Sequence, residues 1–286
     1  MDTLSILPAI DLMRPAAIPF LLTVFLLLTL SRFWQSIPKT WRFTGDLTVV
    51  LGILVTYFVF DRPAIIYLFT PSRPMDWIPA LVLISFISRH LLKKIPSLLF
   101  QLLMITLSTV ILLFPLLHQN LTSGFILVAE ILGLWLLAQS LTLQNEETGV
   151  SRVTLVPIFL TTVTLGALSP LSGSLLLGQL AGGLAAIWLA MILAGPPRVF
   201  LSGVEPGIAL GSLLLIARQY VDLSFIVVEA LYLATLAGVL MDRILSLQVP
   251  PRPFLRVFLP TLVTLLFLTG AIVKTLQTSQ GAGSGY

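Results

Sequence analysis

The sequence predicts an all-α, polytopic integral membrane protein with about ten transmembrane helices. Hydrophobic residues make up 57% of the 286 residues and charged residues only 10%, whereas a soluble domain carries about 25% charged residues. Apolar runs long enough to cross a bilayer follow one another along almost the whole chain. Lys and Arg gather in the short segments between these runs, which is the pattern of membrane topology. The net charge of +4 therefore does not indicate a nucleic-acid partner.

The first half of the chain holds five apolar runs, each bounded by polar or proline-containing segments. They are residues 16–33, 47–60, 77–92, 97–117 and 122–143. Trp34 and Trp41 flank the basic loop after the first run, as interfacial anchors do. Asp46 precedes the second run as a plausible N-cap. The apolar segment 64–70 is too short to span and is expected to be interfacial or re-entrant.

The second half holds five more runs. They are residues 153–168, 172–194, 203–217, 223–241 and 254–274. A Ser169-Pro170 turn leads from the sixth run to the seventh, and Pro196 and Pro197 end the seventh because proline cannot continue a helix. We expect residues 1–274 to form a single transmembrane domain and residues 275–286, which are polar and rich in Gly and Ser, to form a flexible tail.

Small residues recur at every fourth position in runs seven, eight and nine. Such ridges allow helix backbones to approach closely in lipid. The predicted helix-packing residues are Ser174, Gly178, Gly182, Ala186, Gly207, Gly211, Ala234 and Gly238. We therefore expect these three runs to be the most tightly packed part of the bundle. Runs seven and eight are expected to form a close antiparallel hairpin, in which a leucine at Gly182 would reduce the folded yield.

The distribution of basic residues predicts an orientation. With ten spans, one set of alternate loops holds eleven of the sixteen Lys and Arg residues. The positive-inside rule then places both termini outside the cytoplasm, with a bacterial-type inner membrane as the default location. A weak internal similarity relates runs five and six to runs nine and ten, which predicts a possible parallel repeat; chance similarity between short apolar segments is the alternative.

Two glutamates, Glu130 and Glu229, fall within predicted spans. An ionisable group in a membrane span is costly, so it usually faces the interior of the bundle and often has a function. Under the ten-span arrangement the two carboxylates lie at similar depth, where a close pair would share a proton or bind a cation. The alternative is that each glutamate only orders helix packing.

Four further polar residues are candidates to line a cavity: Gln101, Gln139, Gln179 and Glu205. For the three glutamines the simpler interpretation is hydrogen bonding between helices. Glu205 stands in the first turn of the eighth run, where a carboxylate complements the helix dipole. Because Gly203 and Gly207 flank the Glu205-Pro206 pair, an unwound segment lining a cavity is the alternative.

The chain lacks the residues and motifs that most enzyme chemistry requires. It has no cysteine and two histidines that lie far apart, so no metal site is expected, and no nucleotide-binding or hydrolase motif occurs. We expect no enzymatic activity and no cofactor. The sequence favours a transport protein, coupled to protons or cations and acting on a small or apolar solute. The alternative is a non-catalytic subunit of a membrane complex, with lipids, partner subunits or a second copy of the chain as partners.

Overall fold

The structure is a computed structural model. It describes residues 44–60, 71, 73–92, 96–117, 150–194, 198–199, 201, 203–221, 223–246 and 253–282, together with residues 21, 24, 25, 132, 133, 135 and 136. Most of the first and fifth predicted runs lies outside these residues. The expected similarity of runs five and six to runs nine and ten is therefore only half covered.

The described chain is helical, apart from one very short antiparallel strand pair. The elements are α2 (Thr44–Phe60), the 3-10 helix η4 (Pro74–Asp76), α4 (Trp77–Leu91), α5 (Ser97–Leu117), β1 (Val150–Ser151), α7 (Arg152–Leu171), α8 (Leu175–Ala194), β2 (Arg198–Val199), α9 (Val204–Tyr220), α10 (Phe225–Ser246) and α11 (Pro253–Ala282). Strand β1 pairs with β2. Helices α7, α8, α10 and α11 are long and apolar enough to cross a membrane, which agrees with the predicted membrane-protein class.

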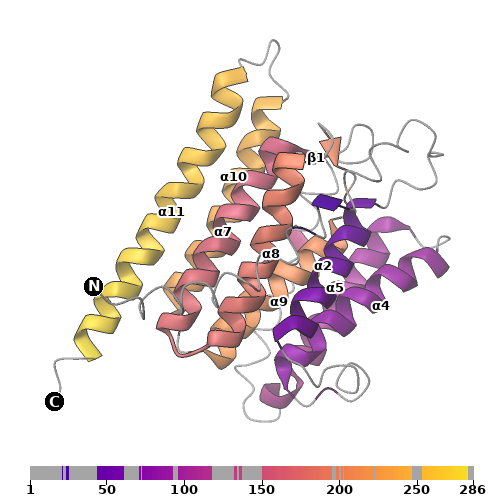
Figure 1. The fold of residues 1–286 in the computed structure, drawn as a ribbon, viewed down its shortest axis with the longest axis horizontal. Helices are drawn as coiled ribbons and strands as arrows, with labels where there is room; N and C mark the ends of the chain where they lie inside the picture. The colour runs from indigo at the N-terminus through magenta and orange to yellow at the C-terminus, as the bar shows by residue number, and fades with distance from the viewer. Residues whose placement is uncertain are drawn as a thin grey trace.

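The helices form two packed groups (Figure 1). Helices α7 and α8 pair along their length, α10 and α11 pair in the same way, and α7 also contacts both α10 and α11. The other group consists of α2, α4 and α5, and these pack on α9. Every residue of α9 from Val204 to Ala217 is buried, so α9 is the central helix of the described bundle.

Helix α8 pairs closely with α7 rather than with α9, so the predicted hairpin between runs seven and eight is wrong. The small residues explain the choice. A Cβ atom at Gly166 of α7 would lie 3.3 Å from the backbone nitrogen of Gly182, and one at Gly178 would lie 2.7 Å from the Pro170 ring. The short turn between α7 and α8 holds these surfaces together, whereas β2 and the segment around it separate α8 from α9.

The glycines of α8 differ in what their missing side chains would meet. A Cβ atom at Gly183 would clash with the Thr56 side chain of α2, whose own Cβ lies 2.9 Å away. A Cβ atom at Gly182 would meet nothing within 4 Å. The backbone of Gly182, rather than its side-chain direction, therefore faces α7, and the effect of a leucine at this position stays a prediction.

The other predicted packing residues occupy varied places. Gly238 is close to α7 and α11, since its Cβ would lie 2.6 Å from Pro157 and would also clash with the Thr264 hydroxyl. Ala234 is fully buried, and its carbonyl accepts a bond from Thr264 at 3.3 Å. The remaining predicted positions on α8 and α9 are buried, except for Ser174, which is half-buried. These positions are Ser174, Ala186, Gly207 and Gly211.

Helix α11 continues to Ala282, eight residues beyond the predicted end of its run. Thr275 is buried, and its hydroxyl donates to the carbonyl of Ala271 at 3.0 Å. The first part of the expected flexible tail is therefore helical, because leucine and glutamine are good helix formers and the backbone pattern of the span simply continues.

The bundle has two ends, which we name after a residue at each. The Arg89 end holds the first residues of α2, α5, α7, α9 and α11, the last residues of α4, α8 and α10, and the β1–β2 pair. The Asp76 end holds the opposite ends of these helices. The described Lys and Arg residues divide unequally, with Arg89, Arg152, Arg198, Arg243 and Arg256 at the Arg89 end and Arg73, Arg218 and Lys274 at the Asp76 end.

Candidate functional site

Three charged side chains meet where the ends of three helices converge. Asp46 lies in the first turn of α2, Glu205 in the first turn of α9, and Arg89 in the last turn of α4. Each charge complements the dipole of its own helix, since carboxylates are favoured at helix N-termini and cations at C-termini. The antiparallel packing of α4 against α2 and α9 then brings opposite charges together.

One nitrogen of Arg89 serves both carboxylates. Its Nη1 atom lies 3.4 Å from Oδ2 of Asp46 and 3.7 Å from Oε2 of Glu205. The Asp46 and Glu205 side chains are 5% and 0% exposed, whereas the Arg89 side chain is 40% exposed. The cluster is thus two buried acids behind a guanidinium that reaches the surface. Both distances exceed the roughly 2.7–2.9 Å of a tight charge-assisted hydrogen bond, which is typical of a shared donor.

The chain enters α9 through a sharp turn that fixes the position of Glu205. Gly203 is the N-cap residue, with φ 81° and ψ −21°. This left-handed conformation is easily reached by glycine and is costly for residues with a Cβ atom. The helix is regular from Val204 onward. The first-turn interpretation of Glu205 therefore agrees with the structure, and the alternative of an unwound segment at this point does not.

A second polar cluster lies at the opposite end of the α2–α4 pair. The hydroxyl of Tyr57 donates to Oδ1 of Asp76 at 2.6 Å, and Arg73 contacts the same atom through Nη2 at 2.9 Å. Tyr57 and Asp76 are fully buried, while the Arg73 side chain is 48% exposed. Burial by itself raises the pKa of Asp76, but the hydrogen bonds from Arg73 and Tyr57 outweigh it and hold that pKa below its ordinary value.

Glu229 does not lie in an apolar setting. Its Oε1 atom is 3.0 Å from Nη1 of Arg218, and its side chain is 38% exposed. Arg218 also stacks over the ring of Phe225, with 4.5 Å between the guanidinium carbon and the ring centroid. Glu130, the predicted partner of Glu229, lies outside the described residues. The structure therefore gives Glu229 a basic partner from α9 that sequence reasoning had not assigned.

The three glutamines have different surroundings. Gln101 is buried on α5, and Gln179 is half-buried on α8. Gln139 lies outside the described residues.

Asp242 was missed by sequence reasoning. It is 1% exposed and accepts a bond from Arg256 Nε at 2.9 Å and another from the hydroxyl of Thr154. These three residues tie the end of α10 to the starts of α11 and α7. Arg89 was likewise counted only as a loop cation. It lies within the predicted run 77–92, but its pairing with acids of other helices has no signal in the sequence.

Two buried hydrogen-bond donors, one on α4 and one on α8, lack a partner among the described residues. They are the hydroxyl of Ser85, one turn before Arg89 on α4, and the indole nitrogen of Trp188 on α8. A buried polar group without a partner costs about 1–3 kcal/mol. Such groups therefore point to water or a ligand that completes the hydrogen bonding.

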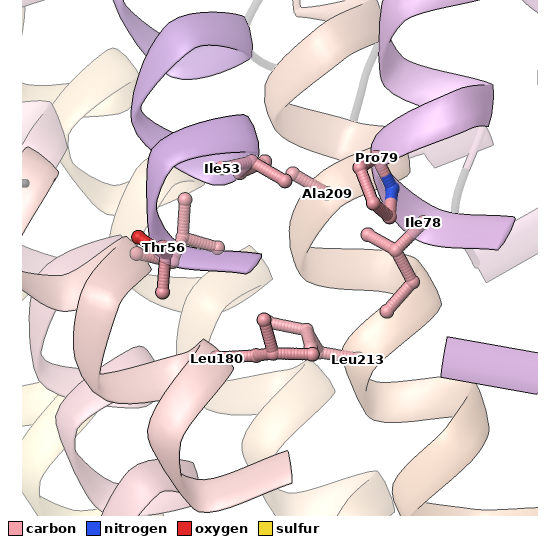
Figure 2. A pocket seen from close by; sticks show the side chains of 8 residues that line it. Ile53, Thr56, Ile78, Pro79, Leu180, Ala209 and Leu213 are labelled. Atoms are coloured by element: carbon pink, nitrogen blue, oxygen red, sulfur yellow. The ribbon is translucent and has the colours of Figure 1, made fainter. Parts of the chain in front are cut away.

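A small cavity lies between α2, α4, α8 and α9 (Figure 2). Its volume is about 10 Å³, and its lining residues are Ile53, Thr56, Ile78, Pro79, Leu180, Leu184, Ala209 and Leu213. This volume admits about one water molecule. The hydroxyl of Thr56 donates to the carbonyl of Gly52 at 2.7 Å, so the wall is apolar apart from this one group.

Among the described residues no group of three or more His, Asp or Glu side chains is arranged to hold a metal ion. Comparison with known proteins adds no family assignment, since neither a protein-family model, nor a curated protein, nor a solved structure matches this chain.

Proposed function

We propose that the protein is a multi-pass transport protein of the plasma (inner) membrane, with ten spans, coupled to protons or small cations. The observation that carries the proposal is the sharing of Arg89 Nη1 between Asp46 and Glu205. The transported solute is small or apolar, because most of the buried side chains that the structure describes are hydrophobic.

The shared arginine gives the cluster two alternative arrangements. When one carboxylate binds a proton, its attraction for the guanidinium falls and the arginine is left to the other carboxylate. Each proton that is bound or released therefore moves the arginine from one carboxylate to the other. Since Asp46 and Glu205 belong to different helices, each step changes which helix α4 is tied to. This links proton binding to helix movement.

The buried unpartnered donors support the proposal independently. Ser85 lies one turn further into the bundle than Arg89, and its hydroxyl has no partner among the described residues. A water molecule or a solute passing inward from Arg89 would satisfy it.

The orientation follows from the distribution of positive charge. Of the basic residues that the structure describes, the larger share lies at the Arg89 end. By the positive-inside rule we propose that this end faces the cytoplasm, which places both termini on the other side under the ten-span arrangement. The coupling cluster is then open to the cytoplasm through the half-exposed arginine.

The test measures proton flux into proteoliposomes that contain the purified protein and a pH-sensitive dye in the lumen. An imposed potential should drive proton entry in the wild type, and Glu205→Gln or Asp46→Asn should reduce that flux strongly. Infrared difference spectra over a pH titration should show a protonated carboxyl band that Glu205→Gln removes. Wild-type flux and an unchanged carboxyl band in both variants would refute the proposed coupling site.

Glu229→Gln and Glu130→Gln serve as matched controls, because the sequence alone favoured those two residues. Glu229 is ion-paired and partly exposed, so its neutral variant should retain most of the flux. If the flux falls in the Glu130 and Glu229 variants but not in those at Asp46 and Glu205, the coupling site is the glutamate pair that the sequence predicted.

One observation favours the second candidate function, a non-catalytic subunit of a membrane complex. Over its apolar window α11 is only 22% buried, compared with 67% for α8. Large apolar side chains cover its outer face. Lipid tails satisfy such a face, and so does a partner helix or a second copy of the chain. Mass measurement of the protein in mild detergent, with chemical cross-linking in native membranes, distinguishes a monomer in lipid from a subunit.

A further inference from the structure

The seam between α2 and α4 is closed at both ends by the same kind of contact. At the Arg89 end, Arg89 of α4 binds Asp46 of α2. At the Asp76 end, Tyr57 of α2 binds Asp76, the residue directly before α4. Each end places a buried carboxylate behind a half-exposed arginine, since the side chains of Arg89 and Arg73 are 40% and 48% exposed.

The cavity lies between these two contacts. Along α2, Thr56 is ten residues from Asp46 and next to Tyr57, so the cavity is about 15 Å from one contact and about one residue from the other. Along α4, the cavity residues Ile78 and Pro79 lie near Asp76, and the unpartnered Ser85 lies between them and Arg89. Figure 2 shows Ile53 and Thr56 on one side of the cavity and Ile78 and Pro79 on the other.

We propose that this cavity is the solute site and that the two contacts are the gates of an alternating-access cycle. This inference rests on the proposed transport function. The structure then corresponds to an occluded state, because both contacts are formed and the cavity between them has a volume of only about 10 Å³. The ligand class is a small, mainly apolar molecule with one polar group, which the apolar walls and the Thr56 hydroxyl would bind.

The gates differ chemically, and this gives the cycle a direction. The link at the Arg89 end is an ion pair that protonation of a carboxylate weakens. The link at the Asp76 end is a hydrogen bond from a tyrosine, and Arg73 holds the acid in its charged form. Protonation of Asp46 from the cytoplasmic side therefore leaves Arg89 to Glu205 and opens the Arg89 gate while the other gate stays closed, which is the condition for alternating access.

The absence of cysteine from the natural chain allows a direct test. Ala209→Cys places one thiol in the cavity wall, where the residue is fully buried. A membrane-impermeant maleimide is added to the inside or the outside of oriented vesicles. With intact gates the labelling should be slow from both sides. Adding Arg89→Ala should speed labelling from the cytoplasmic side, and adding Tyr57→Phe should speed it from the other side.

The expected increase is about tenfold or more in each case, as for loss of a closing contact equivalent to one hydrogen bond to a charged group. Leu165→Cys is the control, because this residue is fully buried on α7 and does not line the cavity. It should stay unlabelled in every background. Equal labelling at Ala209→Cys and Leu165→Cys would mean that the gate variant is unfolded. In that case Arg89→Lys or Asp76→Asn replaces it. If the replacement shows no side-specific opening, that gate is abandoned.

Unchanged labelling at Ala209→Cys in both gate variants, or opening from the same side in both, would overturn the inference. The result separates from that of the proposed function. Loss of proton flux in Glu205→Gln with unchanged cavity access would leave coupling in place and remove the gates. Side-specific access to the cavity with unaltered proton flux in Glu205→Gln would leave the gates in place and remove the proposed coupling site.

Discussion

Oε2 of Glu205 lies 3.7 Å from Nη1 of Arg89, and the Glu205 side chain has no exposed surface. This contact joins the first turn of the central helix α9 to the last turn of α4. It places a carboxylate in the interior of the described bundle with its basic partner at the surface. Asp76 and Arg73 repeat this arrangement of a buried acid and a half-exposed base at the other end of α4.

The pair Arg89–Glu205 should show measurable coupling in a double-mutant cycle. We expect Arg89→Ala and Glu205→Gln together to destabilise the protein less than the sum of the single changes, by about 1 kcal/mol. The value stays near that of exposed pairs because the arginine is 40% exposed and screened by water. Unfolding in detergent, followed by thermal scanning, measures it. Strict additivity would show that the two side chains do not interact.

Asp76 should make stability depend on pH in the acidic range. Because its folded-state pKa is lowered, its contribution is fully present above the unfolded-state pKa, about 4, and is lost as the pH falls through the folded-state pKa. Asp76→Asn should flatten the stability curve below about pH 4. Thermal unfolding from pH 6 down to pH 2 tests this, and a wild-type curve with no slope in that range would contradict it.

Tyr57→Phe should alter the same curve in a defined direction. The change removes a buried 2.6 Å hydrogen bond to the charged carboxylate, at a cost of about 1.5–3 kcal/mol. Without that bond the charged form is less favoured, so the folded-state pKa of Asp76 rises toward its unfolded-state value, and the acid-induced loss of stability becomes smaller and ends at a higher pH. Tyr220→Phe, which loses a hydroxyl bonded to the carbonyl of Leu112, is the control and should leave the acid midpoint unchanged.

The neighbouring glycines 182 and 183 should respond oppositely to an added methyl group. Gly183→Ala should lower the folded yield and the unfolding temperature, because its Cβ would overlap the short, branched Thr56 side chain. Gly182→Ala should be nearly neutral or slightly stabilising, since its Cβ meets nothing within 4 Å and alanine favours the helix.

A second substitution shows whether overpacking causes the effect. Thr56→Ala should restore part of the stability that Gly183→Ala removes, because it clears the atoms that the new methyl group meets. Unfolding temperatures of the two single variants and the double variant in one detergent provide the comparison. Equal losses of stability in Gly182→Ala and Gly183→Ala, or no gain of stability when Thr56→Ala is added to Gly183→Ala, would mean that Gly183 and Thr56 are not in close contact.

Asp242→Asn should destabilise the protein more than Glu229→Gln. Asp242 is 1% exposed and holds both Arg256 and Thr154, so loss of its charge should cost about 1.5–3 kcal/mol. Glu229 is 38% exposed, and its pair with Arg218 should contribute under about 1 kcal/mol. Denaturant titration in mixed micelles measures both values. The reverse order would show that the α7–α10–α11 junction does not depend on Asp242.

The sequence predicted the helical membrane class because composition alone settles it: too few charges and too many long apolar runs leave no soluble alternative. The approximate bounds of helices α2, α4, α5 and α7 to α11 also followed from local signals, chiefly proline and charged residues at their ends. The sequence also placed Glu205 in the first turn of a helix, because a carboxylate is favoured at a helix N-terminus. It could not assign the partners of the acids, because ion pairing depends on which helix ends become neighbours.

Helix pairing was the property that the sequence alone left open. Small residues on α8 indicated a close contact but not which helix would make it, since a ridge of glycine and alanine fits any helix with a matching surface. The tertiary structure chose α7 and α2 for α8, and it brought Arg89 between Asp46 and Glu205. The sequence by itself determined that this chain forms membrane helices. Only the packing of those helices decided that two distant carboxylates share one arginine, because that contact is made across three elements and leaves no periodic pattern in any one of them.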